Sequence, residues 1–511
     1  MTSKMHSYIT LSQSDNISIA LKHLSKGENI NNILIQEDIK PGFKFANQKL
    51  KIGDSCIRYG SYIGNITRNT NAGACVHTHN LEYRKESAPE IKPSSPPQSP
   101  DLKPLKKDYL FDGYVRNNGD VATRNYIGVI STVNCANTVV DEITNYFRFG
   151  EGQKLIQSIN TNVSLIDGVV PIKHNLGCAM EKNGSGHQLL RNTVSGYAQH
   201  PNFCFVIVIG LGCEVNDMSY LAESVPSLKF LSIQKSGGSR KCSDAGINLV
   251  QNFLNSQTIE KRVPLPISHL KISLQCGGSD SLSGITANPL LGHSIDKIIN
   301  AGGTAVLGET PEIYGAEHLL LQRALNNKIS DKLKEKILWW EKYTSNLGES
   351  MNNNPSLGNI EGGISNIAEK SLGAIAKSGG TALVDVIDYS EKITKSGLIF
   401  MDTPGYDPVS VTGHIAGGCN LVCFTTGRGS AFGSFPSPTI KISSNSKLFK
   451  TQAEDIDFDA GVILSSNANI QDLADKLLIT IIAIASGKKS KSESLGYGYN
   501  EFVPWHLGAV L

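Results

Sequence analysis

The sequence lacks any hydrophobic run long enough to cross a membrane. Its longest apolar runs lie near Phe203–Leu211 and Leu477–Ala485, and both fall well short of the roughly 20 residues that a bilayer-spanning helix needs. The first ten residues are polar, so no secretory signal peptide is expected. These absences predict a soluble, cytoplasmic protein without a membrane partner.

Strong net charge and a disulfide framework are missing as well. The chain has 48 basic and 46 acidic residues, and its net charge of +2 creates no overall field that would attract nucleic acid. The ten cysteines show no compact, evenly spaced pattern. We therefore expect reduced thiols that serve as metal ligands or reactive groups rather than disulfides.

The length of 511 residues exceeds what one ordinary core can hold, so several domains are expected. Many of the 49 glycines stand in short polar runs, which indicates tight loops around ligands. The composition predicts a small, mostly β module, a disordered linker rich in Pro and Ser, and a Rossmann-like α/β body of two subdomains. Their expected bounds are 1–86, 87–107, 108–250 and 251–511.

Hydrophobic patterns place the elements within these units. In the first module, short strands are predicted at 31–35, 54–59 and 62–66, and a helix at 17–24. In the body, strands that end in Gly-rich loops or turns are predicted at 125–133, 203–209, 272–274, 304–307, 381–386, 397–401 and 421–424. Strands of this kind belong to an α/β sheet that binds ligands at the carboxyl ends of its strands.

A pair of histidines, His77 and His79, closes the first module. In an extended segment their side chains would point to the same side and could share one metal ion. Two surface histidines beside a linker are the structural alternative. A complete metal site would also need carboxylate or thiolate ligands from elsewhere in the chain.

Three cysteines stand in Gly-rich turns after predicted strands, namely Cys178, Cys213 and Cys276. Polar residues accompany them: His174, Glu214 and Asp280. If the strands are neighbours, the loops meet in one pocket that could hold iron through thiolates. Alternatively, each cysteine is a small buried residue in a tight turn.

An acidic run follows the strand at 304–307. Glu309 and Glu312, with Glu317 and His318 close behind, could bind a divalent cation or supply a general base. Acidic residues at a solvated helix N-terminus are the alternative. Glu309 is the stronger candidate because it comes almost directly after the strand.

The turn Gly427-Arg428-Gly429 offers backbone N–H groups and a guanidinium that could hold a carboxylate or a phosphate. It is neither a Walker A motif nor a dinucleotide fingerprint, because the required spacings are absent. Arg124, just before a predicted strand, is a second candidate for the carboxylate clamp.

Several stretches together resemble the altronate and galactarate dehydratase family. They are GYVRNNGDVATRNYIGVISTVNC (113–135), HNLGC (174–178), GLGCE (210–214), QCGGSDSLSGITANP (275–289), GGTAVLGETPEIYGAEHLL (302–320), EKSLGAI (369–375), FMDTPGYDPVSVTG (400–413) and FTTGRGSAFG (424–433). The first module, with IRYGSYIG (57–64) and VHTHNL (76–81), resembles the SAF domain of this family. The HTHN segment makes the chain more similar to the altronate type than to the galactarate type.

The resemblance implies a hydro-lyase that removes water from C2–C3 of a hexonate or hexarate and leaves a 2-keto-3-deoxy acid. It implies a divalent metal, Fe²⁺ or Mn²⁺, and a small sugar acid as substrate, and it leaves a second copy of the chain open as a partner. We expect metal on His77, His79 and His174, and a base at Glu309 or Glu312. Cys178, Cys213 and Cys276 are expected as further catalytic residues. The substrate would be held by Arg124, Asp280, Gly427, Arg428 and Gly429.

The chain departs from the family pattern at four places. Phe43 replaces the histidine of a usual Gly-His-Lys, and Ile360 replaces the lysine of a usual Gly-Asn-Lys. Asn118-Gly119-Asp120 stands for Asp-Gly-Arg, and His414 for a more usual Gln. Two other functions therefore stay open: a related lyase with another leaving group, as in sulfolactate-type relatives, and a sugar-acid-binding protein without catalysis.

Overall fold

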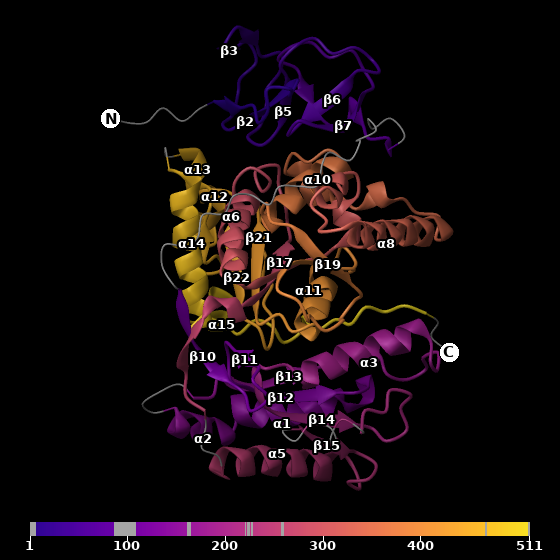
Figure 1. Ribbon diagram of the computed structural model, residues 1–511, viewed down its shortest axis with the longest axis vertical. Helices are drawn as coiled ribbons and strands as arrows, with labels where there is room; N and C mark the ends of the chain where they lie inside the picture. Colours follow the sequence, from indigo (N-terminus) through magenta and orange to yellow (C-terminus); the bar gives the residue numbers. More distant parts are fainter. Residues whose placement is uncertain are drawn as a thin grey trace.

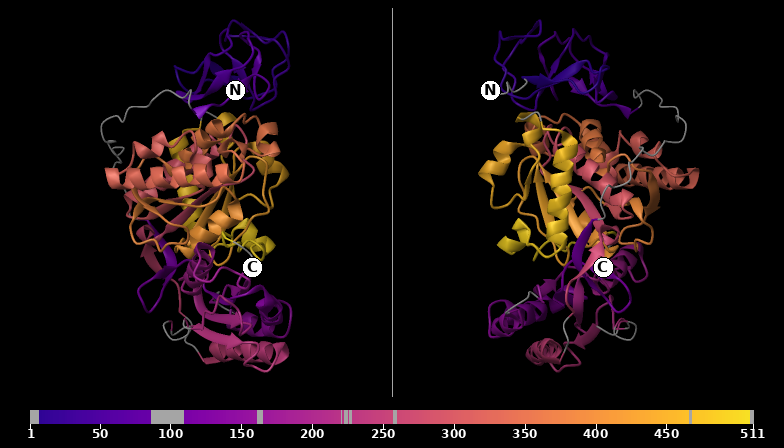
Figure 2. Two further views of the ribbon diagram at one scale, coloured as in Figure 1. Left: turned by 90° about the vertical axis from the view of Figure 1, so that its right-hand side faces the viewer. Right: turned by 60° about the vertical axis from the view of Figure 1, so that its left-hand side comes forward.

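The computed structural model describes residues 7–85, 109–160, 165–219, 221, 225, 228–256, 260–465 and 468–508. Three units follow one another along the longest axis of the molecule, with the N-terminal unit at one end (Figure 1). The two turned views show the same order (Figure 2). The linker predicted at 87–107 lies outside the described residues.

Domain one, residues 7–85, consists of short antiparallel strands. Its sheets have the orders β1-β2-β5-β8, β6-β7-β9 and β3-β4. The strands are β1 (Tyr8–Ile9), β2 (Ile17–Ala20), β3 (Asn29–Ile30), β4 (Ile33–Leu34), β5 (Lys44–Ala46), β6 (Ser55–Arg58), β7 (Ser61–Ile66), β8 (Cys75–Val76) and β9 (Leu81–Glu82). The strands predicted at 54–59 and 62–66 are confirmed as β6 and β7. The strand predicted at 31–35 is reduced to β4, because Asn31 and Asn32 form the turn between β3 and β4.

The helix predicted at 17–24 is wrong, because the segment forms strand β2. All four residues of β2 are buried, and β2 pairs with β1 on one edge and with β5 on the other. Apolar residues that are buried on both faces of a short strand give no alternation, so the pattern alone could not separate this strand from a helix.

Domain two contains a four-stranded parallel sheet of order β13-β12-β14-β15. Its strands are β12 (Tyr126–Ser131), β13 (Gly168–Ile172), β14 (Phe203–Gly210) and β15 (Leu228–Ser232), and its helices are η2 (Asn134–Ala136), α1 (Asn137–Arg148), α2 (Gly152–Ile159), α3 (Ser185–Ala198) and α5 (Ser239–Ser256). A small antiparallel sheet of β10 (Leu110–Val115), β11 (Val121–Ala122) and β16 (Val263–Pro266) adjoins it. The boundary predicted at 250/251 falls inside α5.

Domain three contains a seven-stranded sheet of order β19-β20-β18-β17-β21-β22-β23, in which every pairing is parallel. The strands are β17 (Lys271–Cys276), β18 (Thr304–Leu307), β19 (Leu383–Ile387), β20 (Gly397–Met401), β21 (Leu421–Thr426), β22 (Thr439–Ser443) and β23 (Phe458–Asp459). Strands β12 and β21 are buried along their whole length, as expected for parallel strands covered on both faces.

Helices surround this sheet. They are η3 (Ile267–His269), α6 (Ala287–Asn300), η4 (Thr310–Ile313), α7 (His318–Leu321), α8 (Asn327–Asn346), η5 (Met351–Asn353), α9 (Leu357–Glu361), α10 (Ile367–Ile375), η6 (Ala376–Ser378), α11 (Asp407–Ala416), α12 (Ser446–Thr451), α13 (Val462–Ser465), α14 (Ile470–Ala485) and α15 (Lys491–Leu495). None of the described helices is long and apolar enough to cross a lipid bilayer.

Domain one docks onto domain three through a buried ion network. Lys44 Nζ lies 2.9 Å from Glu369 Oε2, and Arg58 binds the other oxygen of the same carboxylate. Lys44 also donates to the carbonyl of Gly363 at 2.8 Å. All three side chains are almost fully buried. Because one carboxylate compensates two buried cations, this contact fixes domain one above α10.

We predict that Glu369→Gln lowers the free energy of unfolding by about 3–5 kcal/mol, because it leaves Lys44 and Arg58 buried without a counter-charge. Denaturant unfolding measures the loss. Glu361→Gln is the matched control, since Glu361 pairs with Arg428 at the surface and its side chain is 68% exposed. That change should cost less than about 1 kcal/mol. Equal losses in the two variants would contradict the assigned role of Glu369.

Candidate active site

The centre of the candidate site lies at the carboxyl edge of the seven-stranded sheet. From β17, successive strands build outward on one side as β18 and β20, and on the other as β21 and β22. Open α/β sheets bind ligands at the carboxyl ends of their strands, at such a switch point. Cys276 ends β17 and Glu309 follows β18 by two residues, so both stand at this edge.

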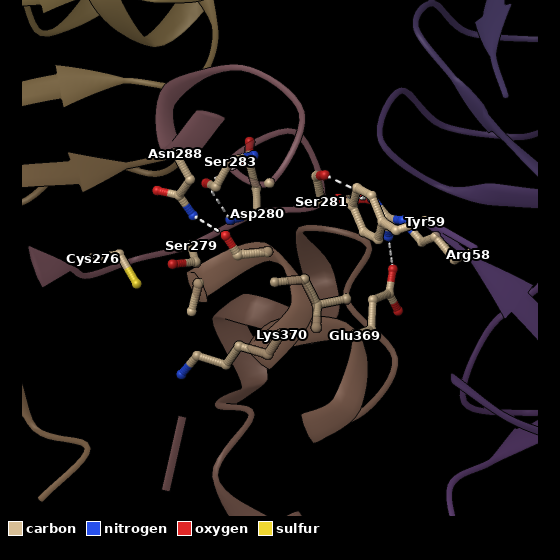
Figure 3. Close-up of a pocket in the computed structure, with 14 residues that line it drawn as sticks. Arg58, Tyr59, Cys276, Ser279, Asp280, Ser281, Ser283, Asn288, Glu369 and Lys370 are labelled. Carbon is tan, nitrogen blue, oxygen red and sulfur yellow. Dashed lines mark hydrogen bonds and ion pairs between the residues drawn. The ribbon is translucent and has the colours of Figure 1, made fainter. Parts of the chain in front are cut away.

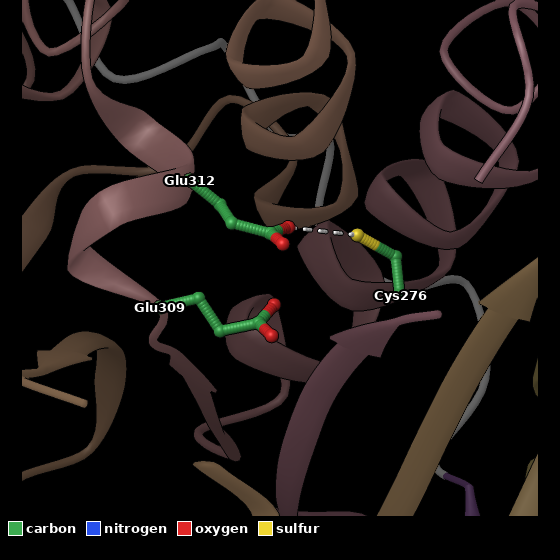
Figure 4. Close-up of side chains that lie close together, drawn as sticks. All are labelled: Cys276, Glu309 and Glu312. Atoms are coloured by element: carbon green, nitrogen blue, oxygen red, sulfur yellow. Dashed lines mark hydrogen bonds between the residues drawn. The ribbon is translucent and has the colours of Figure 1, made fainter. Parts of the chain in front are cut away.

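Three side chains meet there, those of Cys276, Glu309 and Glu312 (Figure 4). The Cys276 sulfur and one oxygen from each carboxylate all lie within 4.8 Å of one another, and all three residues are buried. Glu309 has a backbone φ of 64°, a left-handed conformation that is rare for a residue other than glycine. Such strain gathers at functional sites. Among the described residues, this group alone has metal-ligand geometry by this criterion.

The Glu309 carboxylate has no hydrogen-bond partner on either oxygen, although it is buried. Its only ion pair is a loose one, in which Lys377 Nζ lies 3.5 Å from Oε2. Burial, reinforced by the nearby charge of Glu312, raises the pKa of Glu309 well above its usual value. A buried carboxylate without partners is costly, and a cation would supply what is missing. Two carboxylates and a thiol could therefore hold a divalent transition metal here.

Two lysines that the sequence analysis missed complete the charge pattern. Lys370 Nζ lies 2.6 Å from Glu312 Oε1, and Lys377 Nζ lies 2.9 Å from the Cys276 sulfur. Burial raises the pKa of the Cys276 thiol to about 12, against the opposing effect of Lys377. Lys370 lies on α10 and Lys377 on the following short helix η6, so no helical spacing in the sequence links them.

Asp407 and His414 border the group from α11. Burial, followed by the charge of Glu312, raises the pKa of Asp407 to about 6. Burial, followed by Lys377, lowers the pKa of His414 to about 3, so the imidazole is neutral. Its Nδ1 lies 2.8 Å from Ser273 Oγ, and its Nε2 has no partner. A Cβ on Gly308 would lie 2.5 Å from that Nε2, so the ring packs against the end of β18.

The charges of the group leave room for a cation. Glu309, Glu312 and Asp407 carry three negative charges when ionised, and a thiolate at Cys276 would add a fourth. Lys370 and Lys377 supply two positive charges. The remaining two negative charges would be compensated by one divalent ion, which agrees with the unpartnered Glu309 carboxylate.

A pocket connects Cys276 to domain one (Figure 3). Residues from domain three and from the docking network line it, among them Arg58, Tyr59, Cys276, Asn288, Glu369 and Lys370. Arg58 Nε is buried there without a hydrogen-bond partner. The docked first domain therefore forms one wall of the pocket.

The two histidines of domain one do not join the carboxylate–thiol group. Residues 77–80 form a turn closed by the hydrogen bond from Asn80 N–H to the His77 carbonyl, so the assumption of an extended segment was wrong. His79 is exposed. His77 Nδ1 lies 3.3 Å from Ser365 Oγ of domain three. Burial, followed by Lys44, lowers the pKa of His77 to about 4.

Two departures from the family pattern lie beside His77. The Phe43 ring centroid is 4.9 Å from that of His77, and His77 also contacts the backbone of Ile360. Phe43 therefore places an apolar ring beside His77 where the family pattern has a histidine.

The expected convergence of three cysteine loops is wrong. Cys178 and Cys213 follow strands of the four-stranded sheet, whereas Cys276 belongs to the seven-stranded sheet. Cys178 and Cys213 are exposed and Cys276 is buried. His174 is buried, with Nε2 3.0 Å from the Ser131 carbonyl and Nδ1 accepting from Leu176 N–H. Both of its ring nitrogens are occupied, which argues against the expected ligand role.

Arg124 binds a carboxylate, but it is that of Glu493 within the chain. Its remaining N–H groups donate to the carbonyls of Thr123, Ile484 and Lys488, so all five donors are used internally. The structure therefore corrects the expected role of Arg124 as a substrate clamp. Arg124 instead ties domain two to the C-terminal segment.

Asp280 is likewise engaged within the protein. Its carboxylate accepts from Ser283 and Ser444 and lies against Gly427, where an added Cβ would approach it to 2.2 Å. Asp280 and Gly427 thus join two loops instead of offering free contacts. Arg428 is half-exposed and pairs only with exposed Glu361, and Gly429 has a φ of 94°, so the carboxylate-binding role of this turn stays a prediction.

Comparison with protein families gives matches along nearly the whole chain. Models of the D-galactarate/altronate dehydratase C-terminal region, of the D-galactarate dehydratase/altronate hydrolase second domain and of the altronate/galactarate dehydratase SAF domain match residues 267–510, 113–258 and 6–84, respectively.

Curated relatives agree with these matches. The chain is 34% identical to altronate dehydratase of Bacillus subtilis (strain 168) over 491 residues, 95% of this chain and 96% of the relative. It is 34% identical to altronate dehydratase of Escherichia coli (strain K12) over 495 residues, with coverages of 95% and 96%. It is 31% identical to the (2R)-sulfolactate sulfo-lyase subunit beta of Chromohalobacter salexigens over 408 residues, 78% of this chain and 97% of the relative.

The raised pKa of Glu309 predicts how metal-free protein responds to pH. A group with a raised folded-state pKa binds protons more tightly in the folded state, so its contribution to stability is lost as pH rises above the unfolded-state value of about 4.3. After treatment with a chelator, the unfolding free energy should fall as the pH rises above about 4.3, and Glu309→Gln should reduce that slope. Glu335→Gln, at the exposed surface of α8, should keep the wild-type slope. Identical slopes in all three proteins would contradict the assignment.

Proposed function

The chain belongs to the altronate and galactarate dehydratase family, and from this premise we propose that it is a metal-dependent hydro-lyase acting on an altronate-like hexonate. The product would be a 2-keto-3-deoxy acid. The observation that carries the proposal is the unpartnered Glu309 carboxylate beside Cys276 and Glu312, at the carboxyl edge of the seven-stranded sheet.

Loss of water from a sugar acid requires removal of a proton from the carbon next to the carboxylate. The carboxylate then carries additional negative charge that the site must stabilise. Cys276 and Glu312 are the residues that would hold Fe²⁺ or Mn²⁺, and Glu309 would stand beside the ion. When bound, such an ion supplies a Lewis acid for the developing charge and for the departing hydroxide.

Glu309 is our candidate for the base. A catalytic base works best when its pKa lies near the working pH, and burial shifts Glu309 upward toward that range. Lys377, 3.5 Å away, stabilises the ionised carboxylate that accepts the proton. Lys370 holds Glu312 in place through their ion pair and the hydrogen bond to Asn354.

Substrate contacts would come from both ends of the pocket. Arg58 offers an unused Nε donor from domain one, and Asn288 adds a polar side chain to the wall. Arg428, with only an exposed partner, could hold a carboxylate at the outer rim.

We predict that the protein, loaded with Fe²⁺ or Mn²⁺, converts altronate to a 2-keto-3-deoxy acid detectable by mass spectrometry. Galactarate and other hexonates and hexarates test the breadth of the site. Sulfolactate tests the alternative supported by the sulfo-lyase relative, with sulfite as the expected product of that reaction. Tight sugar-acid binding without any product, in metal-loaded protein, would instead favour the binding-protein alternative and overturn the proposal.

Glu309→Gln should lower kcat by about 10²–10⁴-fold, the contribution typical of a general base. Metal content, measured on the same sample, separates two roles of Glu309. If Glu309 is only the base, the variant keeps its bound metal while kcat falls. If Glu309 is an essential ligand, the variant loses both the metal and the activity. The matched control Glu335→Gln, at the exposed surface of α8, should keep wild-type kcat. Unchanged activity in the Glu309→Gln variant would contradict the assignment of Glu309 to the active site.

A further inference from the structure

Three of the ten cysteines are exposed, and they occupy one edge of domain two. Cys135 follows β12, Cys178 follows β13 and Cys213 follows β14. These strands are neighbours in the order β13-β12-β14, and all run parallel. Carboxyl ends of parallel neighbours meet at the same edge, so three thiols stand on adjacent loops at the ligand-binding edge of the sheet.

Thr132 fixes the relative positions of these loops. Its carbonyl accepts from Asn216 Nδ2 at 2.9 Å, and its Oγ1 donates to Glu214 at 2.6 Å. A Cβ on Gly177 would approach the Thr132 carbonyl oxygen to 2.3 Å, so the second loop packs directly on the first. Each thiol is thus carried by a loop that contacts Thr132 or its neighbours.

Backbone hydrogen bonds tie the loops together a second time. Asn134 N–H donates to the Leu176 carbonyl at 3.0 Å, and Asn216 N–H donates to the Gly177 carbonyl at 3.1 Å. Asn134 directly precedes Cys135, and Gly177 directly precedes Cys178. Cys213 lies three residues before Asn216. The three thiols are therefore carried on one rigid, preorganised edge.

Other ligand groups at this edge are already occupied. His174 uses both ring nitrogens within the chain, and the Glu214 carboxylate accepts from Thr132 and from the N–H groups of Leu211 and Gly212. The Cys213 sulfur accepts a hydrogen bond from Gln234 Nε2 at 3.3 Å. The groups left for an external ligand are soft sulfur atoms.

We propose that Cys135, Cys178 and Cys213 together ligate an iron–sulfur cluster. Thiolates select soft metals and iron–sulfur clusters, whereas a structural zinc site requires four protein ligands, and the described part of this edge offers three free thiols. Three cysteines leave one iron without a protein ligand and open to a small oxygen-bearing molecule. The hydrogen bond from Gln234 would tune the cluster through sulfur. Binding releases the protons of the three thiols.

This centre is separate from the Cys276 group, which lies on the other sheet. The inference does not depend on the proposed dehydratase activity. Loss of the cluster and loss of the Glu309 chemistry are distinguished by measuring iron and sulfide instead of turnover alone.

The test uses the full chain, purified without oxygen and reconstituted with sulfide and equal amounts of Fe²⁺ and Fe³⁺, which supply the oxidation state of the usual cluster core. Wild-type protein should bind iron and acid-labile sulfide in equal amounts, roughly four of each per chain, with visible absorption typical of a cluster. Cys135→Ser, Cys178→Ser and Cys213→Ser should each lose at least about tenfold in cluster content. Cys75→Ser, a half-buried thiol of domain one, is the matched control and should match wild type.

Alkylation provides a second readout that does not depend on how well each variant folds. In wild-type protein, the three thiols should react with iodoacetamide when metal-free and be protected after reconstitution. Absence of iron and sulfide in reconstituted wild type, or cluster content unaffected by all three substitutions, would overturn the proposal. Zinc bound in place of iron and sulfide, or a disulfide among the three cysteines, would also overturn it.

Discussion

The two buried ion pairs that Glu369 forms with Lys44 and Arg58 are the interactions on which the arrangement of the site depends. Glu369 faces domain one from α10 and compensates Lys44 and Arg58, while the next residue, Lys370, faces the sheet edge and pairs with Glu312. Asn366, which caps the same helix, donates to the Ile63 carbonyl of domain one. One helix therefore links the docking of domain one to the charge balance of the candidate active site.

The site itself is defined by an incomplete charge pattern. Glu312 has Lys370, but Glu309 is held in a left-handed backbone conformation with both carboxylate oxygens unpartnered. Burial without compensation is unfavourable in a finished core, so such a group indicates a place kept for a ligand or an ion. Because domain one also closes the pocket through Arg58 and Tyr59, docking would exclude water and strengthen electrostatic interactions inside.

Domain two and domain three share a parallel-sheet architecture but present different side chains at the carboxyl edge of the sheet. In both, parallel strands end in Gly-rich loops that present polar groups at one edge. The edge in domain three gathers carboxylates, amines and one buried thiol, whereas the edge in domain two presents exposed thiols. Arg124 and Glu493 bind domain two to the C-terminal segment, and a shared apolar core that includes β14, α3, α11 and β21 fixes the two domains together.

The sequence by itself determined the α/β class, the small β module and the importance of the residues after each strand, because these follow from local hydrophobic pattern and glycine placement. It identified Cys276, Glu309 and Glu312 but could not group them. Strand order decides which loops meet, and sequence pattern does not encode it: Cys178 and Cys213 belong to another sheet, and Cys135 stands with them. Only tertiary structure showed that Arg124 and Asp280 are satisfied internally and that Lys377 lies beside Cys276, because long-range packing decides which charges find partners.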